Sequence, residues 1–263
     1  MTTSPQPSLP VDTGRAHPAR VYDWLLGGKD NYPADEAVGE KLPPEARNAA
    51  RQNREFMHRA AAWLATQGID QFLDIGTGIP TEPNLHRIVQ NVVPSARVVY
   101  TDNDPIVLRH AEALLAGSAE GATDYIQADV RDPEAIVRHA RHVLDFDRPV
   151  ALSLIALMHF ITDEQDAHGI VRNLAGTLPS GSYLILSHAA SDLFPELVEL
   201  VVAEYARGGI QLAFRPRAEV ERFFDGMDLV SPGLVTATRW PGSTPPPTPE
   251  PDAGIYTGVA RIR

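Results

Sequence analysis

One short stretch of the sequence joins an acidic residue to a glycine-rich turn, a combination that can bind a nucleotide. Residues 72–78 read FLDIGTG, so an apolar run carries Asp74 into a turn. The turn residues expected to contact a ligand are Gly76, Thr77 and Gly78. Glycine lets a backbone approach a bound nucleotide closely. The stretch therefore predicts a nucleotide pocket at the end of a strand.

Two kinds of nucleotide cofactor suit such a turn. A dinucleotide site has a third glycine and rests a pyrophosphate on the following helix, but Thr81 occupies that third position. Asp74 would also place a negative charge beside the pyrophosphate. A ligand with an ammonium or sulfonium group suits this carboxylate better, which favours S-adenosylmethionine (SAM). The alternative is a NAD-dependent Rossmann oxidoreductase.

Acidic residues stand at the ends of three successive predicted strands: Asp74, Asp102 and Asp129. In type and order this set resembles the class I SAM-dependent methyltransferases. The resemblance implies that Asp102 holds both ribose hydroxyls, because a carboxylate offers two acceptor oxygens. It also implies that Asn103 lies against the adenine ring and that Asp129 accepts from the adenine amino group. Val130 is included with them among the cofactor-binding residues.

A narrower resemblance rests on the N-terminal part of the chain. Residues 19–32 read ARVYDWLLGGKDNY and residues 50–56 read ARQNREF. These stretches are similar to the actinobacterial "S-adenosyl methyltransferase" family, long catalogued only as a domain of unknown function. The similarity runs from about residue 15 to the final strand and includes Pro-Gly-Leu-Val from Pro232. It implies a class I fold and SAM binding, and it supplies no substrate.

Nearly seventy residues precede the first predicted strand, and they are expected to form a lid over the cofactor. Aromatic and glycine residues between positions 22 and 35 favour an ordered loop. Arg54 lies on a helix predicted over 45–67, where its guanidinium could bind the methionyl carboxylate with two parallel hydrogen bonds. The residues expected at the SAM site are Tyr22, Gly28, Asn31 and Arg54. The alternative is an arm packed on the far side of the sheet.

Two histidines are candidates for the general base that would accelerate methylation of a hydroxyl by about 10²–10⁴-fold. His159 follows the fourth strand, in a position similar to the catalytic histidine of plant-type O-methyltransferases. The usual Asp-Trp after it is replaced by Phe-Ile at residues 160–161. His188 ends the fifth strand at the same edge of the sheet. The alternative for both is a packing role.

The elements that would position these residues alternate along the chain. Short apolar runs separated by helical segments predict right-handed crossovers and a doubly wound α/β sheet. The five runs are 71–75, 97–101, 124–128, 150–157 and 182–187, and one of the intervening helices is predicted over 105–116. After a proline-rich link over 241–251, the predicted strands 229–240 and 255–262 should pair antiparallel.

The expected fold is therefore a mainly parallel, seven-stranded, Rossmann-like sheet with an antiparallel C-terminal strand and an N-terminal helical extension. We expect the division to fall between an arm, lid and lead-in helix over 1–68 and the SAM-binding core over 69–263.

Composition limits the remaining choices. The 23 Lys and Arg against 34 Asp and Glu give a formal net charge of −11, which argues against nucleic-acid binding. The sequence has no cysteine, and the histidine spacing predicts no metal site. Residues 1–20 resemble no export signal, and no apolar run is long enough to span a membrane.

We therefore expect a cytoplasmic enzyme that methylates oxygen or nitrogen of a small-molecule acceptor. The alternative is a catalytically silent SAM-binding or sensing module.

Overall fold

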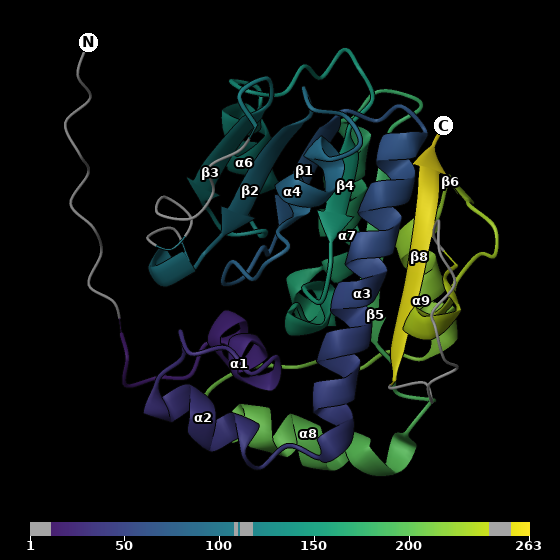
Figure 1. The fold of residues 1–263 in the computed structure, drawn as a ribbon. Coiled ribbons are helices and arrows are strands. Elements are labelled where there is room, and N and C mark those ends of the chain that lie inside the picture. The colour runs from purple at the N-terminus through teal and green to yellow at the C-terminus, as the bar shows by residue number, and fades with distance from the viewer. Residues whose placement is uncertain (1–11, 108–109, 111–117, 242–253) are drawn as a thin grey trace.

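The strands form one mixed sheet in a computed structural model that describes residues 12–107, 110, 118–241 and 254–263 (Figure 1). The strands are β1 Gln71–Ile75, β2 Arg97–Asp102, β3 Ala122–Gln127, β4 Ala151–Leu154, β5 Tyr183–Ala189, β6 Met227–Leu229, β7 Val235–Thr236 and β8 Ile255–Ile262. Their order is β3-β2-β1-β4-β5-β8-β6, and β7 pairs with β8.

The sheet is parallel from β3 to β5 and antiparallel around β8. Seven strands follow one another along this path, and the two-residue β7 is added beside β8. Because the order reverses between β1 and β4, the carboxyl ends of these strands border a crevice in which doubly wound sheets bind ligands. The expected α/β fold class is confirmed.

Helices cover both faces of the sheet and gather at one end. They are α1 Pro18–Leu25, α2 Pro33–Gly39, α3 Pro44–Thr66, α4 Leu85–Gln90, α6 Pro133–Ala140, α7 Ala167–Gly176, α8 Pro195–Arg207 and α9 Arg217–Glu221. Figure 1 shows α1, α2 and α8 together beyond the carboxyl ends of the parallel strands, while α3 runs along one face. None of the described helices is long and apolar enough to cross a membrane.

The long helix α3 is part of the core rather than an appendage. Its buried side chains Phe56 and Leu64 pack in one hydrophobic cluster with Phe72 of β1 and with Trp240. Phe56 and Trp240 meet edge to face, with ring centroids 5.6 Å apart. Aromatic and aliphatic burial of this kind is the main source of stability. Residues 44–66 are thereby fixed against the sheet that carries the glycine turn.

Two local predictions were wrong. Residues 22–35, expected as a loop, are partly helical. The first helix is capped by the His17 side chain ahead of Pro18, and the second by reciprocal bonds between Tyr32 and Asp35. The strand expected over 229–240 is interrupted at Pro232-Gly233 and divides into β6, β7 and a short 3₁₀ turn. Most of the helix expected over 105–116, and the proline link after residue 241, fall outside the described residues.

Candidate functional site

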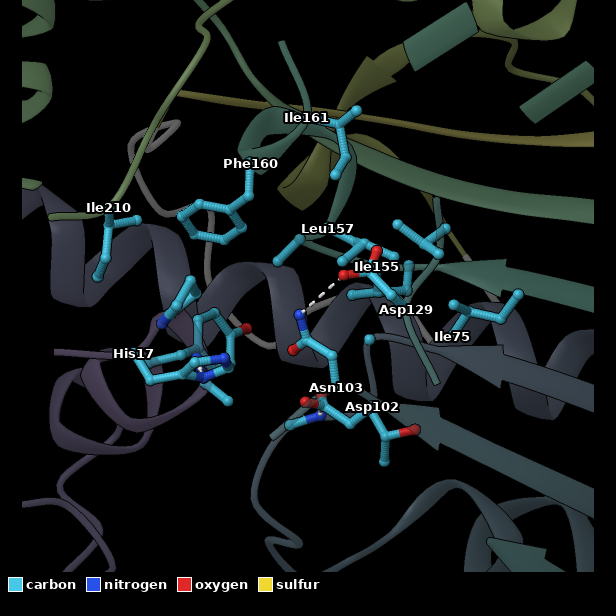
Figure 2. A pocket seen from close by; sticks show the side chains of 18 of the residues that line it. His17, Ile75, Asp102, Asn103, Asp129, Ile155, Leu157, Phe160, Ile161 and Ile210 are labelled. Carbon is cyan, nitrogen blue, oxygen red and sulfur yellow. Dashed lines mark hydrogen bonds between the residues drawn. The ribbon is translucent and has the colours of Figure 1, made fainter. Parts of the chain in front are cut away.

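A cavity of about 470 Å³ opens at the carboxyl ends of β1, β2 and β4, with α1 and α3 contributing to its wall (Figure 2). Ten residues expected at the cofactor line it: Tyr22, Arg54, Asp74, Gly76, Thr77, Gly78, Asp102, Asn103, Asp129 and Val130. They come from the N-terminal helices and from the ends of three neighbouring strands. The segment predicted as a lid therefore contributes directly to this cavity.

The turn after β1 needs its glycines. Gly76 and Gly78 have φ values of +76° and +68°, a backbone region that other residues rarely adopt. A Cβ on Gly76 would also lie 2.8 Å from the Leu157 side chain. The Thr77 hydroxyl donates to the carbonyl oxygen of Asp74 and fixes the turn. The backbone is thus held open to the cavity beside Asp74.

Two residues of opposite charge, Asp74 and Arg54, line the cavity and lie close enough to interact. Asp74 is buried, and this burial raises its pKa to about 6, although the nearby Arg54 guanidinium opposes the shift. The Arg54 guanidinium donates to the carbonyl oxygens of Thr81 and Pro83, and partial burial lowers its pKa. A carboxylate and a guanidinium together match the ammonium and carboxylate groups of a zwitterionic amino acid.

Asp102 lies at the end of β2, facing the glycine turn. One of its oxygens accepts from the Gly78 N–H at 2.9 Å, and the other accepts from the Asp104 N–H at 2.9 Å. Each carboxylate oxygen can accept a second hydrogen bond. Burial raises the pKa of Asp102. The side chain therefore anchors the turn and keeps one acceptor position per oxygen for a diol.

Asp129 already accepts hydrogen bonds from two other residues. Arg131 donates to both of its oxygens, and the Asn103 amide donates to one of them at 3.4 Å. The Arg131 backbone N–H is a further donor, at 2.9 Å. The hydrogen bonds from Arg131 hold the pKa of this carboxyl below its usual range. Asp129 can accept from an adenine amino group only by releasing one of these donors.

Gly28 and Asn31, which were expected at the SAM site, do not line the cavity. The Asn31 amide donates to the Asp23 carboxylate at 2.9 Å and to the Gly28 carbonyl oxygen at 3.1 Å. A Cβ on Gly28 would meet the same Asp23 carboxylate at 2.0 Å. Both residues therefore shape the loop between α1 and α2, one step away from the ligand space.

The two candidate bases occupy different positions. His159 is buried, accepts from the Ala189 N–H at 3.4 Å, and lies outside the lining of the cofactor cavity. Burial, together with the Arg215 charge, lowers its pKa to about 3, so it is a weak base.

His188 is fully buried and contacts Arg215 at 2.7 Å and the Ala189 carbonyl oxygen at 2.8 Å. It does not line the cavity, and its contacts fit a packing role.

No motif marks Arg215, which fixes the loop after β4. Its buried guanidinium donates to the carbonyl oxygens of Met158 and Ile161 at 3.2 and 3.0 Å, besides contacting His188. It also pairs with Asp163, whose side chain is 82% exposed. Arg215 therefore holds residues 158–163 in place beside the cavity.

We expect Arg215→Met to lower the free energy of unfolding by about 2–3 kcal/mol, because two buried carbonyl oxygens and His188 lose a charged donor. Urea unfolding measures this loss. Asp163→Ala is the matched control and should cost less than about 1 kcal/mol, since the Asp163 carboxylate is itself exposed. Equal losses in both variants would assign the effect to the ion pair alone.

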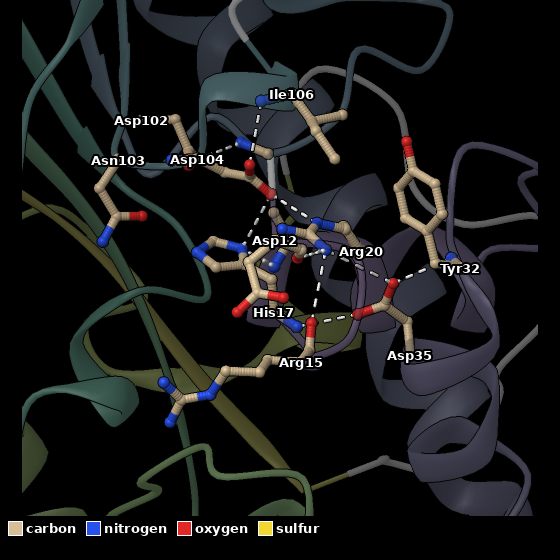
Figure 3. Close-up of polar contacts among 12 residues, drawn as sticks. Asp12, Arg15, His17, Arg20, Tyr32, Asp35, Asp102, Asn103, Asp104 and Ile106 are labelled. Carbon is tan, nitrogen blue, oxygen red and sulfur yellow. Dashed lines mark hydrogen bonds and ion pairs between the residues drawn. The ribbon is translucent and has the colours of Figure 1, made fainter. Parts of the chain in front are cut away.

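A buried ion network fastens α1 to the sheet (Figure 3). Arg20 Nε donates to the Asp104 carboxylate at 2.7 Å, and its Nη1 lies 4.0 Å from Asp35. His17 contributes its backbone N–H to Asp35 at 2.8 Å, and its ring lies 3.3 Å from Asp104. Both carboxylates are fully buried. The network therefore positions His17 and the start of α1, which line the cavity.

Several lining residues lie where no motif could mark them. The segment after α8 contributes Ile210 and Gln211, and α3 contributes Met57. They reach the cavity through tertiary packing between distant segments. The His17-Pro18 pair carried a usable signal, since a polar side chain before proline is typical of a helix start.

Two solved structures resemble the chain over nearly its whole length. A DUF574 family protein from Streptomyces avermitilis is 48% identical, with a TM-score of 0.92 and coverage of 96% of this chain and 99% of that one. A candidate methyltransferase from Thermobifida fusca is 37% identical, with a TM-score of 0.84 and coverage of 96% and 97%. No curated protein matches the chain.

More distant structures share the fold. Magnesium protoporphyrin IX methyltransferase from Synechocystis, with bound S-adenosylhomocysteine, is 14% identical, with a TM-score of 0.52 over 92% of this chain and 93% of that one. The family model described as S-adenosyl methyltransferase matches residues 4–263. Because that match spans almost the entire sequence, the chain belongs to the S-adenosyl methyltransferase family and is a SAM-dependent methyltransferase.

Proposed function

We propose that SAM binds in the 470 Å³ cavity and that its methyl group passes to a small-molecule acceptor. The observation that carries this proposal is the interacting pair of opposite charges, Asp74 and Arg54, in the cavity lining. Asp74 would hold the ammonium group, and Arg54 would hold the carboxylate. The methionyl end of SAM carries an ammonium and a carboxylate group that match this pair of charges. A dinucleotide carries no such pair of groups.

The remaining contacts follow from the strand order. Since β1, β2 and β3 are neighbours, a ligand that starts at Asp74 meets Asp102 next and Asp129 last. Asp102 would bind the two ribose hydroxyls through its free acceptor positions. The adenine ring would lie between Asn103 and Val130, with Asp129 released in part from Arg131.

Catalysis in this proposal rests on positioning. When bound, SAM supplies an electrophilic methyl group on a sulfonium that leaves as a neutral thioether. The chain holds the acceptor in line with that methyl group, and this positioning can supply most of the acceleration. His159, with its low pKa, acts as a hydrogen-bonding group rather than as a strong base. His188 remains the less favourable candidate because of its contacts with Arg215 and Ala189.

The function is tested by incubating the protein with methyl-labelled SAM and fractionated small-molecule extracts. We expect label in a small molecule together with formation of S-adenosylhomocysteine. NAD should not compete with SAM in calorimetry. Tight SAM binding without transfer to any fraction would favour the catalytically silent module, and tight NAD binding would favour the oxidoreductase.

SAM affinity should depend on pH through Asp74. Its raised pKa of about 6 means that it is mostly protonated at about pH 5, so a cationic ligand must displace a proton. We expect the dissociation constant to rise about tenfold between about pH 7 and pH 5. Calorimetry across this range checks the result, and Asp74→Asn should bind weakly without this pH dependence. A flat wild-type profile would remove Asp74 from the ammonium site.

A further inference from the structure

A second cavity, of about 120 Å³, adjoins the cofactor cavity. The two share three lining residues, Tyr22, Ala156 and Phe160, which form the boundary between them. Figure 2 shows Phe160 among the side chains that line the cofactor cavity. Helices α3 and α8 enclose the second cavity, together with residues that follow β4 and β5. A molecule placed there would lie next to the cofactor without overlapping it.

Much of the wall of the second cavity is hydrocarbon. It is formed by Phe194, Leu197, Val198, Val201, Leu212 and Phe214. Glu45 is the single ionisable carboxyl group among the described lining residues, and it is half-exposed. A charged molecule would lose its hydration against this wall without compensation. The wall therefore favours an uncharged, apolar body.

Polar groups occur at the boundary end. The Asn53 amide donates to the Tyr22 hydroxyl at 2.9 Å, and that hydroxyl donates to the Ala50 carbonyl oxygen at 2.9 Å. These bonds fix the orientation of the Asn53 amide. In the reversed orientation Oδ1, an acceptor, would face the Tyr22 oxygen, whose proton is already donated to Ala50. Asn53 lines the second cavity and is 1% exposed, yet its Oδ1 is buried without a partner. Because buried polar atoms are normally hydrogen-bonded, a ligand that donates a hydrogen bond to this oxygen would be favoured.

His159 supplies the complementary group. Its Nδ1 accepts from the Ala189 N–H, so in the neutral ring the proton resides on Nε2. Nε2 has no hydrogen-bond partner among the described residues, and the ring lines the second cavity, 4.5 Å from the Phe160 ring. The boundary end thus offers one acceptor and one donor. A hydroxyl group can satisfy both, since it donates and accepts.

We infer that the methyl acceptor is a neutral, single-ring phenol whose ring occupies the second cavity and whose hydroxyl lies at the boundary, near Asn53 and His159. This inference rests on the proposed function of the cofactor cavity. The second cavity, at about 120 Å³, is smaller than the apolar cavity of about 150 Å³ that holds one benzene molecule. It therefore limits the acceptor to a single ring, with its hydroxyl at the boundary toward the larger cavity. In the reaction the hydroxyl oxygen gains the methyl group, the methyl–sulfur electron pair stays on sulfur, and the phenolic proton passes to water.

The inference is tested by binding, with no turnover required. Ligand-observed NMR on the full chain with saturating S-adenosylhomocysteine compares p-cresol, toluene, p-toluate and 4-methylbenzylamine. We expect p-cresol to bind about five- to tenfold more tightly than toluene, by one hydrogen bond, and p-toluate not to bind. If the protonated benzylamine binds more tightly than p-cresol, the assignment of a phenol is wrong. The acceptor would then be an amine paired with Glu45.

Three variants locate the site. Val201→Phe, which fills the cavity, should abolish p-cresol binding. Leu200→Phe, on the same helix but 44% exposed and outside the lining, should leave it unchanged. Asn53→Leu should retain toluene binding and reduce the preference for p-cresol, since only the His159 bond to the hydroxyl remains. Loss of p-cresol binding in both phenylalanine variants, or an undiminished preference in Asn53→Leu, would overturn the assignment.

Calorimetry with S-adenosylhomocysteine on the same samples separates the two proposals and checks folding. If S-adenosylhomocysteine binds and p-cresol does not, the acceptor class is wrong while the cofactor site stands. If S-adenosylhomocysteine does not bind to the wild type, the proposed function itself fails.

Discussion

Replacing Arg20 with methionine should lower the free energy of unfolding by about 3–5 kcal/mol, because two buried carboxylates lose their compensating charge. Asp104 and Asp35 are fully buried, and the Arg20 side chain is 5% exposed. Methionine preserves much of the side-chain length but supplies no donor. The start of α1 would also lose its attachment beside the cofactor cavity, so SAM affinity should fall in the same variant. Urea unfolding and calorimetry measure the two effects.

Arg47→Met is the matched control for this experiment. Arg47 is exposed and stacks on Trp24, with the guanidinium carbon 3.9 Å from the ring centroid. An exposed cation–π contact is worth about 0.5–1 kcal/mol, so the control should be nearly as stable as the wild type. Adding Asp104→Asn to Arg20→Met should recover part of the loss, since one unpaired buried charge disappears. A loss below about 1 kcal/mol for Arg20→Met would contradict the buried network.

Arg54→Ala should weaken SAM binding by roughly 30–150-fold, since a charged hydrogen-bonding group aimed at a carboxylate contributes about 2–3 kcal/mol. Arg54→Lys should show an intermediate loss, because an ammonium restores the charge but cannot form two parallel bonds. Calorimetry with SAM and with S-adenosylhomocysteine should give the same ranking, since both carry the carboxylate.

The neighbouring Arg51 provides the comparison for Arg54. It lies on the same helix, pairs with Glu55 at 3.1 Å, and is absent from the cavity lining. Arg51→Ala should leave SAM affinity within about twofold of the wild type, as expected of an exposed pair. Unchanged affinity in Arg54→Ala, or an equal loss in Arg51→Ala, would show that the carboxylate binds elsewhere.

Most of the fold was predictable because its signals are local. Apolar runs separated by helical segments specified the parallel strands, and the strand predicted over 255–262 is β8 itself. The structure around Pro232-Gly233 was not predictable in this way. Its division into short strands depends on a turn that interrupts pairing with β8. The helices α1 and α2 were also missed, although His17-Pro18 and Tyr32-Pro33 each carry a capping signal.

The candidate site divides in the same way. Asp74, Asp102 and the glycine turn could be predicted, since the carboxyl ends of neighbouring parallel strands meet at one edge. Side-chain pairing could not be read from strand order. Gly28 and Asn31 are engaged by Asp23, and His188 is engaged by Arg215. The second cavity depends on α8 packing beside α3, which no sequence motif records.

The most direct test is a crystal structure of the complex with S-adenosylhomocysteine, which retains every group of SAM except the methyl. We predict its amino group at Asp74, its carboxylate at Arg54 and its ribose hydroxyls at Asp102, with the sulfur facing the boundary residues Tyr22, Ala156 and Phe160. Adenine beside Arg54, or a molecule bound outside the 470 Å³ cavity, would contradict the account.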